Sequence, residues 1–400
     1  MYDSLKKTQY ENAPKPIWPL ALCAGLLGLG QNGLLVVLPQ LVAMTGLSLS
    51  VWAGLLMFGS ILFLPSSPWW GRQAEIQGCK RVVLSALIGC LVSFCLMAFV
   101  VWGMAEERVG TDWGVIGLIA SRMIYGLSVS GLVPAAQTWA MQRAGMEKRM
   151  AALATISSGL SCGRLLGPPI AALSLGVSPQ APLWLMVFAP LVALMLMVRQ
   201  PNDPPMPPIP SQSAHLRIGM LPFLLLALLL AASISMMQLG LAPHLTPLYP
   251  DAVNQVSHHI ALLLSTAAAS TLLAQFLLVR PQRLSPMPLL CLAALLMVTG
   301  LLMMTISTLV ALYCGIALAS FGSAMATPGY QLLLNDHLTT GKGAGMIATS
   351  HTLGYGLSAL LVPLVAAHYG EQALISTALL LSLCFLSCCG WLFYHHQTKR

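Results

Sequence analysis

The stretch QPNDPPMPPIPSQSAHLR, residues 200–217, divides the chain into two parts of similar length. Its six prolines have no N–H to donate and no apolar period accompanies them, so a helix entering from either side cannot continue through it. The segments on both sides are strongly apolar, since 57% of all residues are hydrophobic and only 8% are charged. This composition predicts an integral membrane protein whose two halves are joined by the stretch as a linker.

Apolar runs of about 20 residues, enough for a helix to cross about 30 Å of hydrocarbon, occur on both sides of the linker. Six precede it, at 17–40, 51–69, 82–103, 114–138, 150–175 and 181–198. Six follow it, at 218–242, 256–279, 286–307, 309–334, 344–367 and 372–394. The predicted fold class is an all-α membrane protein with twelve transmembrane helices in two pseudo-symmetric six-helix bundles. The expected domains are an N-terminal tail at 1–16, a bundle at 17–199, the linker at 200–217, a bundle at 218–395 and a C-terminal tail at 396–400.

An internal repeat relates the two halves. At a constant offset of 194 residues, spans 4 and 5 share residue types with spans 10 and 11: Pro134 and Pro328, Gln137 and Gln331, Lys148 and Lys342, Ala154-Thr155 and Ala348-Thr349, Pro169 and Pro363. A weaker echo links Gln31-Asn32-Gly33 of span 1 with Gln238-Leu239-Gly240 of span 7. Internal repeats of this kind are a common way of building transporters.

Basic residues predict the orientation, because Lys and Arg near span ends are retained in the cytoplasm. With the N-terminus inside, only Arg108 of the 19 basic residues falls in an outside loop, and Arg122 and Arg164 fall within spans. We expect a multi-pass protein of the inner membrane with both termini cytoplasmic. The net charge of +8 is therefore a topology signal and gives no support to nucleic-acid binding. The ten cysteines show neither a disulfide framework nor metal-ligand spacing, so no metal and no cofactor is expected.

The loop between spans 2 and 3 reads GRQAEIQGCKR, residues 71–81. It resembles the signature loop of the major facilitator superfamily at Gly71, Glu75, Gly78, Lys80 and Arg81, although Glu75 replaces the usual Asp and Cys79 stands where a basic residue is common. The resemblance implies that this loop, together with Arg72, forms a charged latch that holds one arrangement of the two halves. Glycines permit the tight turn between the two helices. An acidic residue beside helix ends and basic groups can form or break ion pairs, and so lock or release the arrangement of the two halves. The alternative is an ordinary basic loop that only fixes the orientation.

Span 4 contains LIASRMIYG, residues 118–126, which is similar to another motif of the same family at Leu118, Arg122 and Gly126, with Tyr125 in place of the usual Gln. In the proton-coupled branch the resemblance implies a role for Arg122 in proton coupling. An arginine at membrane depth costs about 2.5–3.5 kcal/mol on insertion scales and normally turns toward a cavity or a partner.

Span 5 contains SSGLSCGRLLGPPIAAL, residues 157–173. Small residues every four positions give this helix a smooth face that admits a neighbouring backbone, and the Gly-Pro pair permits a bend. Gly159, Gly163, Gly167 and Pro168 resemble the span-5 pattern of the drug:proton antiporter branch, which implies a helix at the interface between the halves and favours export. The pattern is incomplete, because Ala154 and Ala171-Ala172 stand where the family has glycines.

Arg164 follows Gly163 and lies about 100° around the helix from the smooth face. Two roles are open: it pins spans together by donating to carbonyls, or it makes a cavity positive and attracts an anion. All 11 acidic residues map to loops, tails or span ends, so no carboxylate neutralises Arg122 and Arg164. A strongly cationic cargo is therefore disfavoured. Proton coupling would need His351, a histidine nearer the surface such as His244, His258 or His259, Glu75, or the cargo itself.

These observations predict a secondary active transporter that moves a small, polar or anionic organic molecule, such as a drug, metabolite or siderophore, by alternating access with proton-coupled export. The expected cavity lining is Gln31, Asn32, Arg122, Tyr125, Arg164, Gln238 and His351. The expected partners are this cargo, protons and the lipid bilayer, and the chain is expected to be monomeric. An importer of an organic anion is the alternative. A membrane enzyme would need a clustered catalytic set, which the sequence does not show, and a channel would need neither the repeat nor the latch loop.

Overall fold

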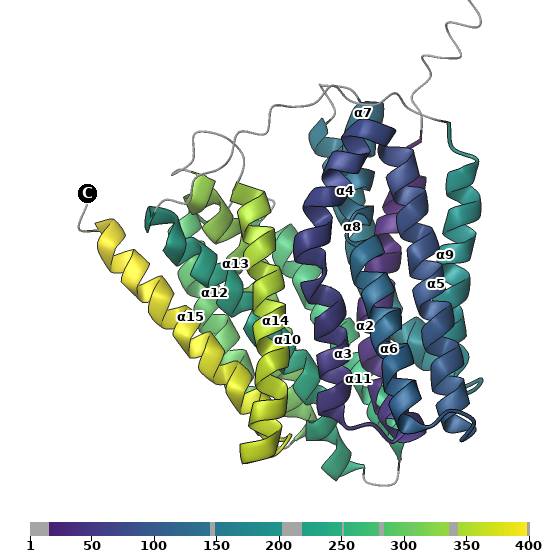
Figure 1. The fold of residues 1–400 in the computed structure, drawn as a ribbon. Helices are drawn as coiled ribbons and strands as arrows, with labels where there is room; N and C mark the ends of the chain where they lie inside the picture. Colours follow the sequence, from purple (N-terminus) through teal and green to yellow (C-terminus); the bar gives the residue numbers. More distant parts are fainter. Residues whose placement is uncertain are drawn as a thin grey trace, which may run out of the picture.

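The structure, a computed structural model, describes residues 16–144, 149–201, 218–249, 252–279, 284–306, 308–335 and 343–397. The predicted tails before residue 16 and after residue 397, most of the predicted linker, and the repeat pair Lys148 and Lys342 lie outside the described residues. Every regular element in the described ranges is a helix (Figure 1). The predicted all-α class is confirmed.

The described helices before the linker make six crossings, because α3 and α4 together form one span and α6 and α7 another. They are α2 (Trp18–Thr45), α3 (Leu49–Ile61), α4 (Phe63–Gln77), α5 (Cys79–Ala105), α6 (Thr111–Val129), α7 (Leu132–Ala144), α8 (Arg149–Leu175) and α9 (Ala181–Val198). Both breaks lie at the fourth residue before a proline, whose missing N–H leaves that carbonyl without its helical partner. The residues concerned are Ile61 before Pro65 and Ser130 before Pro134.

The second half makes six further crossings. They are α10 (Leu221–Leu245), α11 (Val253–Ala274), α12 (Pro286–Met304), α13 (Leu309–Asn335), α14 (Gly343–Tyr369) and α15 (Ala373–Gln397). Short turns extend α10 and α11: η2 (Ile218–Met220), η3 (Thr246–Leu248) and the π-helical η4 (Gln275–Val279). Pro328, the repeat counterpart of Pro134, lies inside the unbroken α13, so the two halves differ at this point.

Eleven helical segments of the described chain are long and apolar enough to cross a membrane. The remaining crossing is α8, whose glycines, serines and Arg164 lower its hydropathy. It is nevertheless a 27-residue helix that lies against α2, α7, α9 and α11, so it is an integral part of the bundle. The chain is therefore a multi-pass membrane protein.

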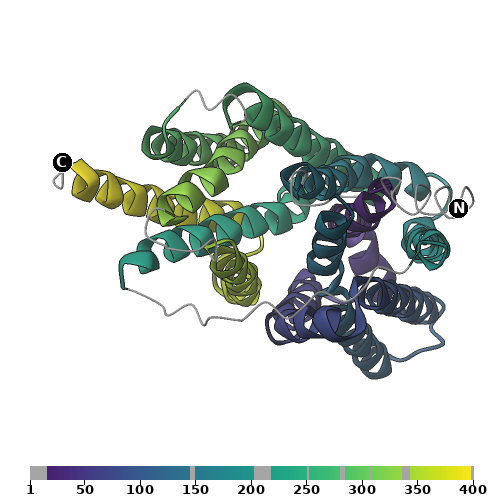
Figure 2. The ribbon, with the colours of Figure 1, turned by 90° about the horizontal axis from the view of Figure 1, so that it is seen from above.

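The same helix pairs are in contact in both halves. α2 runs along α8, as α10 runs along α14; α5 contacts α6 and α9, as α12 contacts α13 and α15. Seen from above, the helices of the two halves form two groups side by side (Figure 2). This recurrence is the arrangement that a tandem repeat of a six-helix unit predicts.

The smooth face of α8 is occupied by the backbone of α2. A Cβ placed at Gly159 would come closer than 3.0 Å to the Ala21 carbonyl, and one at Gly163 closer than 3.0 Å to the carbonyl of Gly25. At Gly167 the same atom would lie 2.8 Å from the Leu29 carbonyl. The predicted close approach is thus present, but the partner is a helix of the same half. α8 also contacts α11 of the second half, so α8 lies between α2 of its own half and α11 of the other half.

The main contacts between the halves pair α8 with α11, α3 with α14, and α2 with α11. We call the end of the bundle where α2 begins the terminal end, and the opposite end the distal end. Near the distal end Gln40 Nε2, in the last turns of α2, donates to Asn254 Oδ1 in the first turn of α11. At mid-height a Cβ at Gly356 of α14 would lie 3.4 Å from Ile61 of α3.

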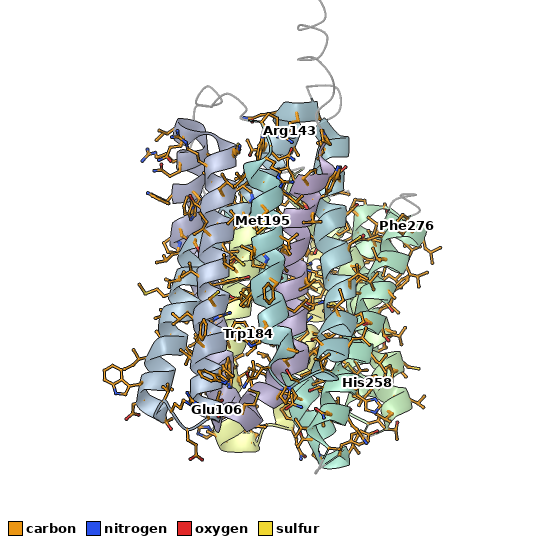
Figure 3. All side chains as sticks on the ribbon, turned by 90° about the vertical axis from the view of Figure 1, so that its right-hand side faces the viewer. Glu106, Arg143, Trp184, Met195, His258 and Phe276 are labelled. Atoms are coloured by element: carbon orange, nitrogen blue, oxygen red, sulfur yellow. The ribbon has the colours of Figure 1, made fainter. Side chains whose placement is uncertain are left out.

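Charges differ between the two ends. Figure 3 shows Arg143 at the terminal end and Glu106 and His258 at the distal end. In the described chain the helix ends and connections at the terminal end carry Arg72, Lys80, Arg81 and Arg199 together with Glu75, whereas those at the distal end carry Glu106, Glu107, Asp112 and Glu371, with Arg108 as a basic exception. Most of these basic residues therefore lie at the terminal end.

Candidate functional site

Arg164 lies on α8 beside α2, with its side chain exposed. Asn32 Nδ2 on α2 donates to the Arg164 carbonyl oxygen over 3.0 Å. Gly28, one turn earlier on α2, makes room for the arginine stem: a Cβ there would lie 3.0 Å from Arg164 Cγ. Gln31, next to Asn32, is exposed as well. Three of the predicted site residues are therefore brought together by the α2–α8 pair.

His351 lies on α14 of the second half, close enough to Arg164 for the two side chains to interact electrostatically. His351 Nε2 lies 2.5 Å from the hydroxyl of Tyr330 on α13, and that hydroxyl lies 3.1 Å from Thr327 Oγ1. Tyr330 is fully buried, so the hydroxyl has no access to bulk water. The result is a chain of three polar side chains that leads from the neighbourhood of Arg164 into the core of the second half.

No carboxylate balances Arg164 within the described chain. The described acidic residues are all at helix ends or in connections, namely Glu75, Glu106, Glu107, Asp112 and Glu371. A guanidinium cannot be neutralised by deprotonation in a protein, so its charge at this depth needs an acceptor or water. An anionic group of a bound molecule would supply that acceptor.

Arg122 occupies a different environment from Arg164. Its side chain is only 4% exposed, within the first half, and Nη2 donates to Met97 Sδ over 3.2 Å. The guanidinium carbon lies 5.1 Å from the Tyr125 ring centre and 5.5 Å from that of Phe94. Nε has no hydrogen-bond partner. Tyr125 in turn stacks on Phe63. Arg122 is thus held by aromatic faces and a thioether, and its guanidinium does not share the exposed surroundings of Arg164.

The aromatic contacts around Arg122 predict how substitutions of Tyr125 change the stability of the protein. We expect Tyr125→Leu to lower the melting temperature of the purified protein in detergent, because a desolvated cation–π contact is worth about 2 kcal/mol. Tyr125→Phe keeps the ring and is expected to leave the melting temperature within the error of the measurement. A Phe variant as unstable as the Leu variant would show that the hydroxyl, and not the ring face, holds Arg122.

The remaining predicted lining residue, Gln238, is half-buried on α10. α10 lies along α14, the helix that carries His351. No contact joins Gln238 to Arg164 in the described structure.

The predicted latch loop lies at the terminal end and is almost entirely helical: residues 71–77 form the last turns of α4, residues 79–81 begin α5, and only Gly78 lies between the two helices. Gly78 has a φ of +87°, a backbone conformation that favours glycine, and ends α4. Lys80 Nζ donates to the carbonyls of Val198, over 3.0 Å, and Gln200, over 2.5 Å, and so caps the end of α9. Gly71, Arg72, Glu75 and Arg81 are exposed. Glu75 forms no ion pair with another described residue, and it borders a small cavity of about 180 Å³ together with Gly71, Cys79 and Pro134 of α7.

Sequence reasoning missed Tyr330, Phe94 and Met97. Tyr330 carries a weak signal, because a tyrosine hydroxyl inside an apolar span must find a partner. Phe94 and Met97 carry no such signal in the sequence. They are ordinary apolar residues that contact Arg122 only because α5 packs against α6.

Comparison with known proteins identifies the family to which this architecture of membrane-crossing helices belongs. The sequence profile described as "Major Facilitator Superfamily" matches residues 20–359. Two relatives, both called multidrug resistance protein MdtG, are 33% identical over 122 residues in Salmonella paratyphi A and 30% identical over 185 residues in Rahnella sp. (strain Y9602). These matches cover 30% and 42% of this chain and only 27% and 41% of the relatives.

Solved structures show the same fold at low identity. A D-xylose-proton symporter superimposes with a TM-score of 0.73 at 14% identity, covering 93% of this chain and 96% of the symporter. The nucleoside transporter NupG gives a TM-score of 0.68 at 12% identity, with 94% and 99% of the two chains covered. The profile match spans most of the chain and the fold agrees with it, so the protein is a secondary transporter and not an enzyme, and it belongs to the major facilitator superfamily.

Proposed function

We propose that this carrier exports a small polar or anionic organic molecule, with a carboxylate-bearing metabolite or siderophore as the best-fitting class, in exchange for protons. The observation that carries the proposal is the exposed guanidinium of Arg164, which no described carboxylate balances and which acts on His351 from the other half. A cargo held between Arg164 and His351 would touch both halves, as an alternating-access mechanism requires.

Gln31, Asn32 and Gln238 would complete the lining as uncharged hydrogen-bonding groups. Asn32 already donates to the Arg164 carbonyl, so it fixes the position of the arginine as well. Arg122 and Tyr125 have a separate role in the proposal: buried in the first half, they would couple its helix packing to the charge state of the site. This division follows from the 4% exposure of Arg122.

The proposed orientation puts the terminal end, with its basic residues, in the cytoplasm and the carrier in the inner membrane. Both halves are in one chain, so the proposed functional unit is a monomer. In the described arrangement the halves meet at mid-height and at the distal end, through Gln40 and Asn254. This supports an inward-facing state, in which the latch residue Glu75 would be released, consistent with its lack of an ion pair among the described residues.

The names of the MdtG relatives favour a second candidate, efflux of apolar or cationic drugs. The lack of an intramembrane carboxylate argues against cationic drugs, because a buried cation needs a counter-charge. Import of an organic anion would use the same site. Everted membrane vesicles decide the direction: with the vesicle interior made acidic, so that protons flow outward, a proton-exchanging exporter accumulates salicylate or citrate inside the vesicles, whereas an importer does not.

His351 is the proposed proton carrier, with Tyr330 and Thr327 as its hydrogen-bonded support. We expect His351→Asn to lower gradient-driven salicylate accumulation in everted vesicles by about tenfold or more, while counterflow exchange without a gradient persists, because the site would bind but no longer titrate. His368→Asn is the matched control on the same helix, since His368 is exposed and its contacts, with the Leu364 carbonyl and the Tyr369 ring, lie within that helix. Full gradient-driven transport by the His351 variant would assign coupling to another group.

A further inference from the structure

A second cavity lies at the distal end of the bundle, away from Arg164. Its volume is about 530 Å³, within the range of small-molecule sites. The first half contributes Pro39, Val42 and Ala43 of α2 and Leu49 of α3. The second half contributes the ends of α10, α11 and α14 with their connections: Ala242, Pro243, Thr246, Pro247, Tyr249, Val253, Val256, Tyr369, Gly370, Glu371 and Gln372. The two halves therefore form the cavity together.

The wall is mainly apolar and carries one charge. Among the described lining residues, Glu371 is the one carboxylate, and none is a lysine, arginine or histidine. Gly370, with a φ of +82°, ends α14 and turns the chain so that Glu371 faces this space. Glu371 is exposed at the rim of the cavity, and partial desolvation by the neighbouring wall raises the pKa of its carboxyl group. A cation beside it would replace the missing solvation.

The aromatic part of the wall is held in place. The Tyr249 ring stacks on His259 at 5.0 Å between ring centres, and His259 Nδ1 lies 3.2 Å from the Tyr313 hydroxyl. Tyr249 is thus held against His259, which Tyr313 holds in turn, and it offers a ring beside the cavity. A flat aromatic molecule would bind more tightly by stacking on this tyrosine ring. If the molecule is also cationic, its charge would be attracted to the face of the ring and would strengthen binding further.

The cavity depends on the conformation that the structure shows. Val42 is two residues beyond Gln40, and Val253 is next to Asn254, so the walls flank the hydrogen bond that joins the halves at this end. Opening the distal end would pull α2 away from α11 and divide the cavity. A ligand that needs both walls binds only the closed arrangement and must stabilise it.

We propose that this distal cavity is a second small-molecule site, which takes an amphipathic aromatic monocation anchored by Tyr249 and Glu371 of the second half and packed against Val42 and Leu49 of the first half, and thereby holds the distal end closed. Its charge preference is opposite to that of the Arg164 site. The ligand would therefore act as an inhibitor of the transport cycle and not as its cargo.

Binding is tested first, with the full chain in lipid nanodiscs and ethidium as the fluorescent probe. Ethidium is expected to bind the wild type, and Glu371→Gln is expected to weaken binding by up to about fivefold, as loss of one exposed charge pair predicts. Glu106→Gln, a change at another distal carboxylate outside the cavity, is the matched control and should bind as the wild type does. Arg164→Gln should also bind normally.

Three outcomes would overturn the site. Unchanged ethidium binding by Glu371→Gln would remove the carboxylate from it, and loss of binding in Arg164→Gln would place the probe at the other site. Binding of the uncharged analogue phenanthridine to the wild type as tightly as ethidium would show an apolar pocket for lipid or detergent instead of a cation site.

The conformational effect is tested by the distance between spin labels at Asp112→Cys and Gln255→Cys, two exposed distal positions outside the cavity, with the other exposed cysteines replaced by serine. Ethidium should increase the population with the shorter distance, and Glu371→Gln should abolish this shift. Binding without any shift would overturn the inhibitory role. Neither readout measures transport, so both remain decisive if the proposed cargo is wrong.

Discussion

Replacing Arg164 with glutamine is expected to reduce transport of organic anions roughly ten- to a hundredfold. Charge-assisted hydrogen bonds are worth about 1.5–3 kcal/mol, and each 1.4 kcal/mol corresponds to about a tenfold change. The measurement is counterflow of citrate, salicylate and carboxyfluorescein in proteoliposomes. Because Arg164 is exposed and its stem is accommodated by Gly28, the shorter glutamine side chain should not disturb the fold.

The control for this variant is Arg164→Lys, which keeps the positive charge but loses the planar fork. It should retain a substantial part of the anion transport, with reduced discrimination between carboxylates. A neutral cargo such as thymidine should respond little to either change. If Arg164→Gln carries every anion as well as the wild type, the anion proposal fails and the arginine has a packing role, while the carrier fold stands.

Replacing Gly163 with leucine is expected to prevent α2 and α8 from packing and to abolish folded protein in the membrane. Even the Cβ would approach the Gly25 carbonyl more closely than real Cβ atoms do, and backbone cannot move aside as a flexible side chain can. Overpacking in cores costs about 1–3 kcal/mol for added methylenes, and four added carbons against backbone should exceed that range. The measurement is the yield of monodisperse protein in detergent and its melting temperature.

Gly163→Ala tests the same contact with a smaller change, and Gly390→Ala is its control. Gly390 is also a helical glycine, but a Cβ there would meet nothing within 4 Å. Alanine should therefore be neutral or slightly stabilising at 390, by about 0.5–1 kcal/mol, and destabilising at 163. Equal melting temperatures for the two alanine variants would contradict the close contact between the helices.

Much of the architecture could be predicted from composition and periodicity, because the bilayer imposes one local rule on every span. Backbone groups in hydrocarbon must be satisfied within the segment, so a run of about 20 apolar residues is a helix whatever its neighbours are. The breaks in spans 2 and 4 were not predicted, although Pro65 and Pro134 hold the reason locally. Pro328 shows why this was difficult, since the same residue type leaves α13 unbroken.

The site could be predicted only in part. The sequence identified Arg164, Arg122 and His351 as polar residues at membrane depth, because such residues are costly and rare there. It treated the two arginines as equivalent. The structure separates them: Arg122 is enclosed by Phe94, Tyr125 and Met97, and Arg164 is exposed.

By itself the sequence determined that the chain spans the membrane as helices, that it consists of two related halves, and that no acidic residue lies within a span. These are properties of local composition, which each segment carries without reference to the others. Tertiary structure alone decided which helix fills the glycine face of α8, which groups surround Arg122, and that Tyr330 meets His351. Those pairings depend on the rotation of each helix about its axis and on which neighbour it packs against, and both are settled by the fit of side chains that are far apart in the sequence.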